Sequence, residues 1–422
     1  MISLAYTLSG LVFFMCSLFL IRQKVSIGFL ALLPKLSAMA LSPYWAIIGA
    51  LGAILGWIYQ ALWAIPMGMI GAIIMTLYAW RCTREHHGFE RAFGPDWAGQ
   101  IPDEQASLMM KKRWSWFLKM KTSPEPLWER DVPFWTIPET NRQLLCDIWR
   151  PSDEKGSGLA FVYLHGSGWA IGDKDFGTRP LFRHLVSQGH TVMDVAYRLM
   201  PEVNIYGMVA DAKRAVAWIK TNAKRYGIDP KKVVLGGASA GAHIALLSGY
   251  TPDHPELTPK DLKKDDLSVC GLVSYYGPVD LLDGYKRYKL KRQPPVPIGT
   301  MIDRTKMQEA VKYAGRFDIL LGGHPEEVPD MYQLACPTTH VHSNTPPTLL
   351  MQGNKDFLVP MKGTRELYAK LLENDVPAVN VVLPWTDHAF DILLPQFSPP
   401  AQSALYDLDR FLALLVNRAI VK

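Results

Sequence analysis

The chain has 422 residues, of which 49% are hydrophobic and 20% are charged, and it carries a formal net charge of +6. This composition excludes a disordered or collagen-like protein, and the length allows two to four ordinary domains. Residues 1–84 hold five basic residues and no acidic one, so the remainder is almost neutral. A basic nucleic-acid-binding face is therefore not expected, and no nucleic-acid partner is predicted.

The N-terminal residues have the composition of a membrane segment. Residues 1–21 and 36–80 contain no charged side chain. Because a spanning helix needs about 20 apolar residues, we expect three spans. Their approximate bounds are 2–21, 40–60 and 63–80. Residues 25–35, interrupted by Pro34 and Lys35, are too short to span and are expected at the interface. A buried pair of soluble helices is the alternative, which the uncharged length disfavours.

The charges flanking these spans predict an orientation. Three spans bring all five basic residues to one side: Arg22, Lys24, Lys35, Arg81 and Arg84. The positive-inside rule makes that side cytoplasmic, so we expect a multi-pass membrane protein with a cytoplasmic catalytic domain. A fourth span would reverse the sides. The basic and aromatic stretch 111–121 suits either an anionic membrane surface or a solvated linker.

The rest of the chain divides into a connector and an α/β domain. After the membrane segment (1–85), residues 86–140 show mixed charge and no clear period. From 141 to 422, short apolar runs alternate with helical patterns, which predicts a mostly parallel sheet flanked by helices. The expected strands are 144–149, 159–164, 191–196, 233–235, 269–275, 348–351 and 379–383. The expected helices are 208–226, 240–248, 362–373 and 401–417. Residues 277–346 interrupt the alternation and are expected to form a cap over the site.

A serine lies on a predicted sharp turn between strand and helix. Gly237-Ala238-Ser239-Ala240-Gly241 directly follows a short apolar strand and opens a helix. Small residues on both sides, above all Gly237 and Gly241, permit the turn, which exposes the Ser239 hydroxyl at the carboxyl edge of the sheet. In this setting the motif predicts a nucleophile.

A serine hydroxyl needs a base that is oriented by an acid. In chain order after Ser239, Asp356 follows one strand end and His388 follows the last strand. Three loops that converge on the same sheet edge predict a Ser-His-Asp triad. Asp387 is the rival acid, but its position next to His388 makes it difficult for its carboxylate to reach that ring's Nδ1.

The loop after the strand 159–164 reads His165-Gly166-Ser167-Gly168-Trp169. We expect the N–H groups of Ser167 and Gly168, together with that of Ala240, to form an oxyanion hole. Gly166 would provide the turn, and His165 is expected to be a structural hydrogen bonder. The glycine spacing does not fit a dinucleotide loop. The five cysteines lack CxxC spacing, and no His-Glu-x-x-His occurs, so no metal site is predicted.

These motifs resemble the α/β-hydrolase fold, and within it the hormone-sensitive-lipase-like carboxylesterases and their feruloyl-esterase-like relatives. Residues 165–169 resemble the family's H-G-G-G-W motif, residues 194–202 its D-Y-R-L-A-P-E block, and 388–390 its H-x-F base motif. The resemblance covers about 141–418 and implies serine esterase chemistry. Two residues depart from it: Ser167 replaces a glycine and is expected either to be tolerated or to crowd the acyl pocket, and Ala196 stands where an acid is common.

The sequence thus predicts a membrane-anchored serine esterase or lipase that forms an acyl-enzyme and needs no cofactor. The anchor favours a lipophilic ester substrate, and its removal is expected to spare activity toward short soluble esters. Two alternatives remain open. One is an amidase or peptidase with the same triad, and the other is a non-catalytic, membrane-tethered ligand-binding protein on the same fold.

Overall fold

The computed structural model describes residues 1–19, 25–119, 125–152, 156–289, 312–313 and 315–417. Its centre is an eight-stranded sheet in the order β1-β2-β4-β3-β5-β6-β7-β8. β2 pairs antiparallel with both β1 and β4. All the other neighbouring strands, from β4 across to β8, pair in parallel. The strands are β1 (Leu127–Thr136), β2 (Gln143–Arg150), β3 (Ala160–Leu164), β4 (Thr191–Val195), β5 (Val233–Ala238), β6 (Gly271–Tyr275), β7 (Thr348–Gly353) and β8 (Ala378–Leu383).

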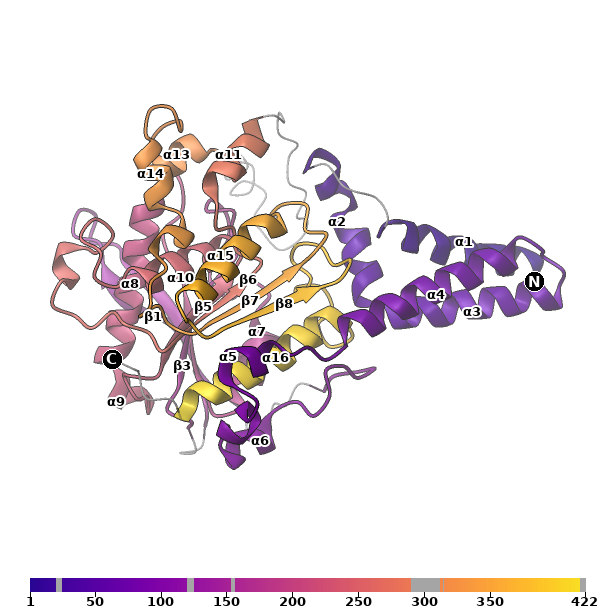
Figure 1. Ribbon diagram of the computed structural model, residues 1–422, viewed down its shortest axis with the longest axis horizontal. Coiled ribbons are helices and arrows are strands. Elements are labelled where there is room, and N and C mark those ends of the chain that lie inside the picture. Colours follow the sequence, from indigo (N-terminus) through magenta and orange to yellow (C-terminus); the bar gives the residue numbers. More distant parts are fainter. Residues whose placement is uncertain (20–24, 120–124, 153–155, 290–311, 314, 418–422) are drawn as a thin grey trace.

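The α/β alternation predicted from residue 141 onward is confirmed. Every residue of β3, β4, β5, β6 and β7 is buried, as expected for parallel strands that are covered on both faces. One face packs against α8 (Ile205–Thr221), α10 (Ala240–Tyr250) and α15 (Met361–Glu373), and the other packs against α7 (Arg179–Val186) and α16 (Pro399–Asn417). Figure 1 shows this layered arrangement.

The sequence prediction missed the first strand. β1 lies within the stretch that was expected to be a connector, and it forms the outer edge of the sheet beside β2. Its pairing is irregular between Glu129 and Val132 and between Pro133 and Trp135. Charged residues and a proline are typical of edge strands, and they hide the alternating pattern that marks a strand. The connector also contains two short helices, α5 (Gly88–Phe93) and α6 (Asp103–Leu108).

The insert between β6 and β7 covers the carboxyl edge of the sheet. It contains α11 (Leu281–Lys289), α13 (Phe317–Leu321) and α14 (Pro329–Leu334), which join the same core as α8 and α10. Residues 290–311 and 314 of the expected cap, together with part of its basic stretch, lie outside the described residues.

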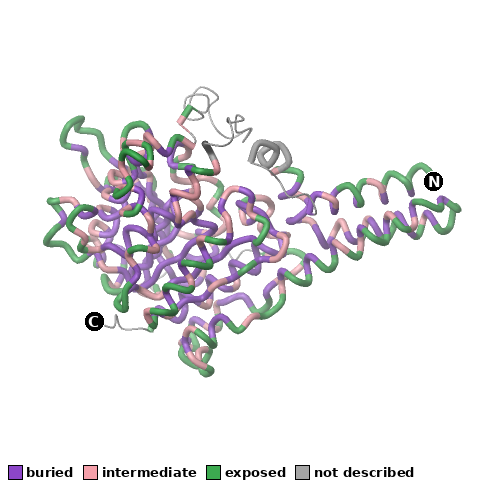
Figure 2. The backbone as a smooth tube through the Cα atoms, turned by 45° about the horizontal axis from the view of Figure 1, so that its top comes forward, coloured by how far each residue is buried: buried purple, intermediate pink, exposed green. Residues whose placement is uncertain are grey.

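The N-terminal residues form a helical bundle that projects from the α/β unit. It consists of α1 (Ile2–Ser17), α3 (Ser42–Ile58) and α4 (Ala64–Cys82), as Figures 1 and 2 show. Among the described residues, α4 is the single helix that is both long and apolar enough to cross a membrane by itself. α1 is shorter, and α3 reaches the required length only together with the bent preceding helix.

The preceding helix is α2 (Val25–Ala40), which crosses the base of the bundle. Its part from Leu32 to Ala40 makes an angle of 82° with α3. The expected interruption at Pro34 and Lys35 is wrong, because α2 continues through both residues. A proline removes one hydrogen-bond donor and bends a helix without necessarily ending it, and Lys35 finds a partner in the α/β unit.

Candidate active site

Ser239 occupies the sharp turn between β5 and α10. Its φ of +51° is unusual for a residue with a side chain, and such strained turns are common at functional sites. The flanking glycines allow this turn to approach β3. A Cβ on Gly237 would lie 2.3 Å from the Leu164 carbonyl oxygen, and one on Gly241 would lie 2.1 Å from the same atom. Both positions therefore require glycine.

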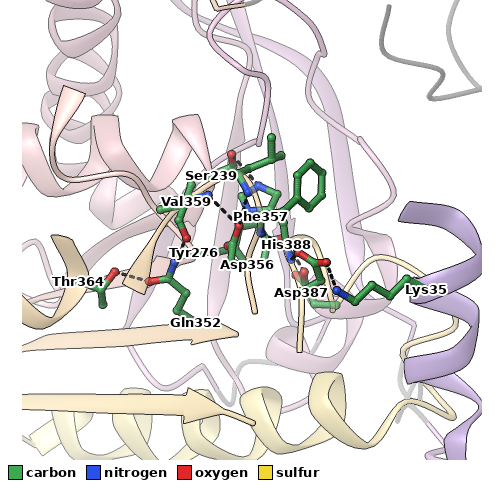
Figure 3. A network of polar contacts seen from close by, with 12 residues as sticks. Lys35, Ser239, Tyr276, Gln352, Asp356, Phe357, Val359, Thr364, Asp387 and His388 are labelled. Atoms are coloured by element: carbon green, nitrogen blue, oxygen red, sulfur yellow. Dashed lines mark hydrogen bonds and ion pairs between the residues drawn. The ribbon is translucent and has the colours of Figure 1, made fainter. Parts of the chain in front are cut away.

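The three residues of the predicted triad meet at the carboxyl edge of the sheet, as Figure 3 shows. His388 Nε2 lies 3.1 Å from Ser239 Oγ, and His388 Nδ1 lies 2.8 Å from Asp356 Oδ2. The second oxygen of Asp356 accepts N–H bonds from Leu358 and Val359 at 2.9 and 2.8 Å. The ring of His388 is thus held between the hydroxyl and one carboxylate.

The loop that carries Asp356 is itself fixed by a buried amide. Gln352 Nε2 donates to the Val359 carbonyl at 2.6 Å, and the Thr364 hydroxyl donates to Gln352 Oε1. Gln352 is fully buried. Buried side chains with satisfied hydrogen bonds restrict the orientation of the groups they hold, here the turn after β7.

The charges around His388 favour its protonated form. Burial alone would lower the pKa of His388, but the carboxylates of Asp356, Asp387 and Asp391 outweigh it and raise that pKa above its ordinary value. Asp391 accepts a hydrogen bond from the Tyr276 hydroxyl at 2.5 Å, and the Tyr276 ring lies 4.5 Å from the His388 ring between centroids. An imidazolium formed at this position would be stabilised.

The predicted oxyanion loop borders the same cavity as Ser239. The cavity is lined by Gly166, Ser167 and Gly168, while Ala240 begins α10 directly after the serine. Among the described residues, the N–H groups of Ser167, Gly168 and Ala240 have no hydrogen-bond acceptor. Free N–H groups beside a serine hydroxyl are what an oxyanion hole requires.

The Ser167 side chain is tied to the loop. Its hydroxyl lies 2.8 Å from the Tyr197 hydroxyl and accepts the Trp169 N–H at 2.9 Å. The Tyr197 hydroxyl also donates to the His165 carbonyl oxygen at 2.7 Å. Tyr197 belongs to the block 194–202 singled out in the sequence, so that block supports the oxyanion loop. Of the two expectations for Ser167, these contacts favour tolerance over crowding.

The His165 ring makes no hydrogen bond to Ser239, His388 or Asp356. It is buried, its ring stacks on Tyr197 at 4.5 Å, and burial lowers its pKa to about 4. A neutral buried imidazole fits the structural role expected from the sequence. Among the described residues, no group of three or more His, Cys, Asp and Glu side chains is arranged to hold a metal ion.

A cavity of about 290 Å³ lies over Ser239, and most of its lining is apolar. The cap contributes Val279, Leu281 and Phe317. The cavity also reaches Leu32 of α2 and Leu405 of α16, so the N-terminal helix α2 contributes to its wall. Such a cavity suits a small molecule or the apolar part of a larger one.

The sequence prediction missed a buried ion pair beside the triad. Lys35 Nζ lies 2.5 Å from Asp387 Oδ2, and both side chains are almost completely buried. The other oxygen of Asp387 accepts the N–H groups of Phe357 and His388 at 3.0 and 2.8 Å. Asp387 therefore contacts the main chain of both loops rather than the His388 ring. A lone charge within an apolar segment signals a nearby partner, but it does not identify that partner.

Comparisons with known proteins place this chain among esterases. A family model named BD-FAE matches residues 146–371, which is more than half of the chain. The chain is 27% identical over 341 residues to esterase LipQ of Mycobacterium tuberculosis, covering 79% of this chain and 74% of LipQ. It is 29% identical over 273 residues to the probable carboxylic ester hydrolase LipM of the same organism, covering 60% of this chain and 55% of LipM.

Solved structures agree on the fold. Esterase B from Lactobacillus rhamnosis matches with a TM-score of 0.53 and 21% identity, covering 70% of this chain and 88% of that protein. The α/β-hydrolase fold and the resemblance to hormone-sensitive-lipase-like carboxylesterases are thereby confirmed. The chain belongs to the BD-FAE family and is a carboxylic ester hydrolase.

Proposed function

We propose that Ser239, His388 and Asp356 are the catalytic triad of this esterase. The observation that carries the proposal is the continuous chain of contacts from Ser239 Oγ through both ring nitrogens of His388 to Asp356 Oδ2. Ser239 Oγ attacks the ester carbonyl carbon while His388 Nε2 takes the hydroxyl proton. The N–H groups of Ser167, Gly168 and Ala240 stabilise the oxyanion.

The second half of the reaction uses the same groups. His388 returns its proton to the leaving alcohol, and the acyl group stays on Ser239. Water, deprotonated by His388, then hydrolyses the acyl-enzyme and restores the serine. Asp356 holds the Nδ1–H tautomer and stabilises the imidazolium in both halves.

Labelling with a fluorophosphonate tests this proposal. We expect the full-length wild-type protein in membranes to react with the probe, because its serine is activated, and Ser239→Ala and His388→Ala to remain unlabelled. Both variants must be shown to be folded by their thermal unfolding. Absence of labelling in folded wild-type protein, or retained labelling in Ser239→Ala, would refute the assignment.

The electrostatics of His388 predict the pH dependence. His388 acts as a base only when neutral, and the surrounding carboxylates raise its pKa above 6.5. We therefore expect kcat/KM for a soluble ester to fall as the pH decreases through a midpoint above 6.5. A pH–rate profile of wild-type protein measures this midpoint, and a value below 6.5 would contradict the electrostatic argument.

We further propose that the bundle of α1, α3 and α4 is embedded in a membrane. Its large apolar side chains lie on the outside: Ile54, Trp57 and Ile73 are each more than half exposed. Its closest contacts are made by small residues, with Gly49 and Gly68 facing each other's main chain. A soluble bundle buries its large residues, whereas membrane helices pack through small ones and expose large ones to lipid.

The ends of the bundle support three crossings. The three helices have 16 to 19 residues, or about 24–29 Å at 1.5 Å per residue, close to a thin hydrocarbon core. Aromatic residues gather at the far tip and at the base, as at membrane interfaces: Trp57, Tyr59, Trp63, Trp45 and Trp80. The basic residues lie at the end nearer the α/β unit: Lys35 pairs with Asp387, Arg81 lies over the Trp385 ring, and Arg84 follows the end of α4. Their position supports a cytoplasmic catalytic domain.

The position of the helical bundle in a membrane supports a lipophilic ester as the substrate. The cavity over Ser239 is mostly apolar and includes Leu32 of α2, the helix that crosses the base of the bundle. An ester that partitions into the bilayer would reach the site beside this helix. Residues 111–119 belong to the stretch that suits either an anionic membrane surface or a solvated linker. They pack on α16 through Arg113 and Asp407, while Trp116 and Phe117 remain exposed.

The packing of the bundle can be tested at Gly68. A Cβ there would lie 2.5 Å from the Gly49 carbonyl oxygen and 2.8 Å from Ser9 Oγ. We expect Gly68→Leu to lower the free energy of unfolding by about 1–3 kcal/mol or more, because it forces α3 and α4 apart. The thermal unfolding temperature in detergent measures this. Ile73→Leu, on the outer face of the same helix, is the matched control, and equal behaviour of the two variants would contradict the proposed packing.

A further inference from the structure

The loop that carries His388 is held by N-terminal helices from far away in the chain. The Tyr78 hydroxyl of α4 lies 3.0 Å from Thr386 Oγ1, and the Arg81 guanidinium lies 4.7 Å from the centroid of the Trp385 ring. The Asp387 N–H donates to Met39 Sδ of α2 at 3.3 Å. Thus α2 and α4 contact the residues immediately before the proposed base.

The same loop is joined to the loop that carries Asp356. The Lys355 N–H donates to the Thr386 carbonyl at 2.9 Å, and the Trp385 N–H donates to Asn354 Oδ1 at 2.7 Å. A Cβ on Gly353 would lie 2.2 Å from the Thr386 carbonyl oxygen, so the two loops approach as closely as glycine permits. A small shift of one loop would therefore change the contact between His388 and Asp356.

Asp387 is the residue where these three segments meet. One carboxylate oxygen accepts the N–H groups of His388, the proposed base, and of Phe357, which directly follows the acid Asp356. The other oxygen accepts the ammonium of Lys35, whose side chain is only 2% exposed. Figure 3 shows Lys35 reaching from its helix to Asp387 beside His388. Burial raises the pKa of the Asp387 carboxyl, and Lys35 opposes that rise.

We infer that Lys35 is a positioning residue of the esterase site: by pairing with Asp387, the N-terminal helix α2 holds the loops of His388 and Asp356 in their reactive arrangement. The inference rests on the proposed triad and extends it to the membrane segment. Lys35 does not touch the reacting atoms. It keeps Asp387 ionised and fixed, so that Asp387 retains both N–H groups.

This inference revises the expectation that removal of the anchor spares activity toward short soluble esters. Removal of the N-terminal helices would also remove Lys35, Met39 and Tyr78, which hold the base loop. The esterase activity would then fall toward every ester, regardless of the solubility of that ester. A point variant at Lys35 separates positioning from membrane attachment, because it leaves the helices in place.

The test compares Lys35→Met with wild-type full-length protein in detergent micelles, using p-nitrophenyl butyrate. We expect kcat to fall about 10-fold to 100-fold with KM changed less than about twofold, since misplacement of a catalytic group affects turnover more than substrate binding. Lys35→Arg, which keeps the charge, should recover most of the loss. Arg113→Met is the matched control, because it breaks another buried pair, with Asp407, outside the base loop.

A double-mutant cycle shows whether Lys35 acts through Asp387. Asp387→Asn keeps an oxygen for the two N–H groups, and Lys35→Met combined with Asp387→Asn leaves no unpaired charge. We expect the double variant to exceed Lys35→Met in kcat at least about fivefold. If the double variant loses the product of the two single kcat losses, Lys35 and Asp387 act independently, and the inference is overturned. If Lys35→Met does not fold, Asp387→Asn alone must still lower kcat at unchanged KM.

The pH dependence of kcat/KM provides a second test. It would not change in Lys35→Met if the Lys35–Asp387 pair only stabilised the fold. His388 faces Asp356, Asp387 and Asp391, and Asp387 faces Lys35, Asp356 and His388. Without Lys35, an Asp387 that stays ionised raises the pKa of His388 further and moves the acid limb of the profile to higher pH, whereas an Asp387 that becomes protonated no longer raises that pKa and moves the limb to lower pH. A shift in either direction is expected if Lys35 acts through Asp387. If Lys35→Met has the kcat of wild type and an unchanged acid limb in its pH profile, the inference is overturned. Failure of folded wild-type protein to react with the fluorophosphonate would instead refute the triad itself.

Discussion

Replacing Ser239 by alanine is expected to lower kcat toward a soluble ester by about 10⁵-fold to 10⁶-fold, because the acyl-enzyme can no longer form. His388→Ala should lower kcat by about the same factor, since the Ser239 hydroxyl is a poor nucleophile without its base. The double variant should be no slower than either single one, because the two residues act as a unit. Steady-state hydrolysis of p-nitrophenyl butyrate by purified full-length variants measures all three.

Ser248→Ala is the matched control for this series. Ser248 lies on the same helix as the turn, it is buried, and its hydroxyl has no hydrogen-bond partner among the described residues. We expect this variant to keep wild-type kcat and KM. Multiplicative losses in the double variant at Ser239 and His388, or residual turnover in Ser239→Ala within about 100-fold of wild type, would contradict a shared covalent mechanism.

Replacing Asp356 by asparagine has the second largest expected effect, a fall in kcat of about 10⁴-fold. An asparagine has the shape of Asp356 but cannot stabilise the imidazolium, and it favours the wrong tautomer of His388. The Leu358 and Val359 N–H bonds that Asp356 accepts would survive through the amide oxygen. The loss should therefore appear in kcat rather than in the unfolding temperature.

The comparison with Asp387→Asn decides between the two candidate acids. Asp356 contacts the His388 ring, whereas Asp387 contacts main-chain N–H groups and Lys35. We expect Asp387→Asn to lower kcat only about 10-fold to 100-fold, because it disturbs the position of the loops but keeps the Asp356 carboxylate that orients His388. A larger loss for Asp387→Asn than for Asp356→Asn would reverse the assignment made from the sequence.

Local sequence patterns were sufficient for much of the α/β unit. Apolar runs of strand length between helical patterns predicted seven of its strands, because burial on both faces imposes that composition. The candidate site was predictable for a related reason. Ser239, Asp356 and His388 each follow a strand, and the carboxyl ends of parallel strands lie at one edge of the sheet.

The sequence patterns did not predict elements that are stabilised by contacts with other segments of the chain. β1 carries charged residues and Pro133 at the edge of the sheet, so its sequence lacks a regular alternation. α2 contains Pro34, and its place across the base of the bundle follows from contacts with α1, α3 and α16. In both cases the partner segment supplies what the local sequence does not indicate.

The sequence by itself determined the family, the order of the proposed triad residues and the apolar character of the first 80 residues, since each of these is encoded in short motifs or in composition. Only the tertiary structure decided how the N-terminal helices meet the site. Lys35 and Asp387 are 352 residues apart in the chain, and Leu32 reaches the cavity from outside the α/β unit. Such contacts depend on how whole elements pack, because no local period links two residues so distant.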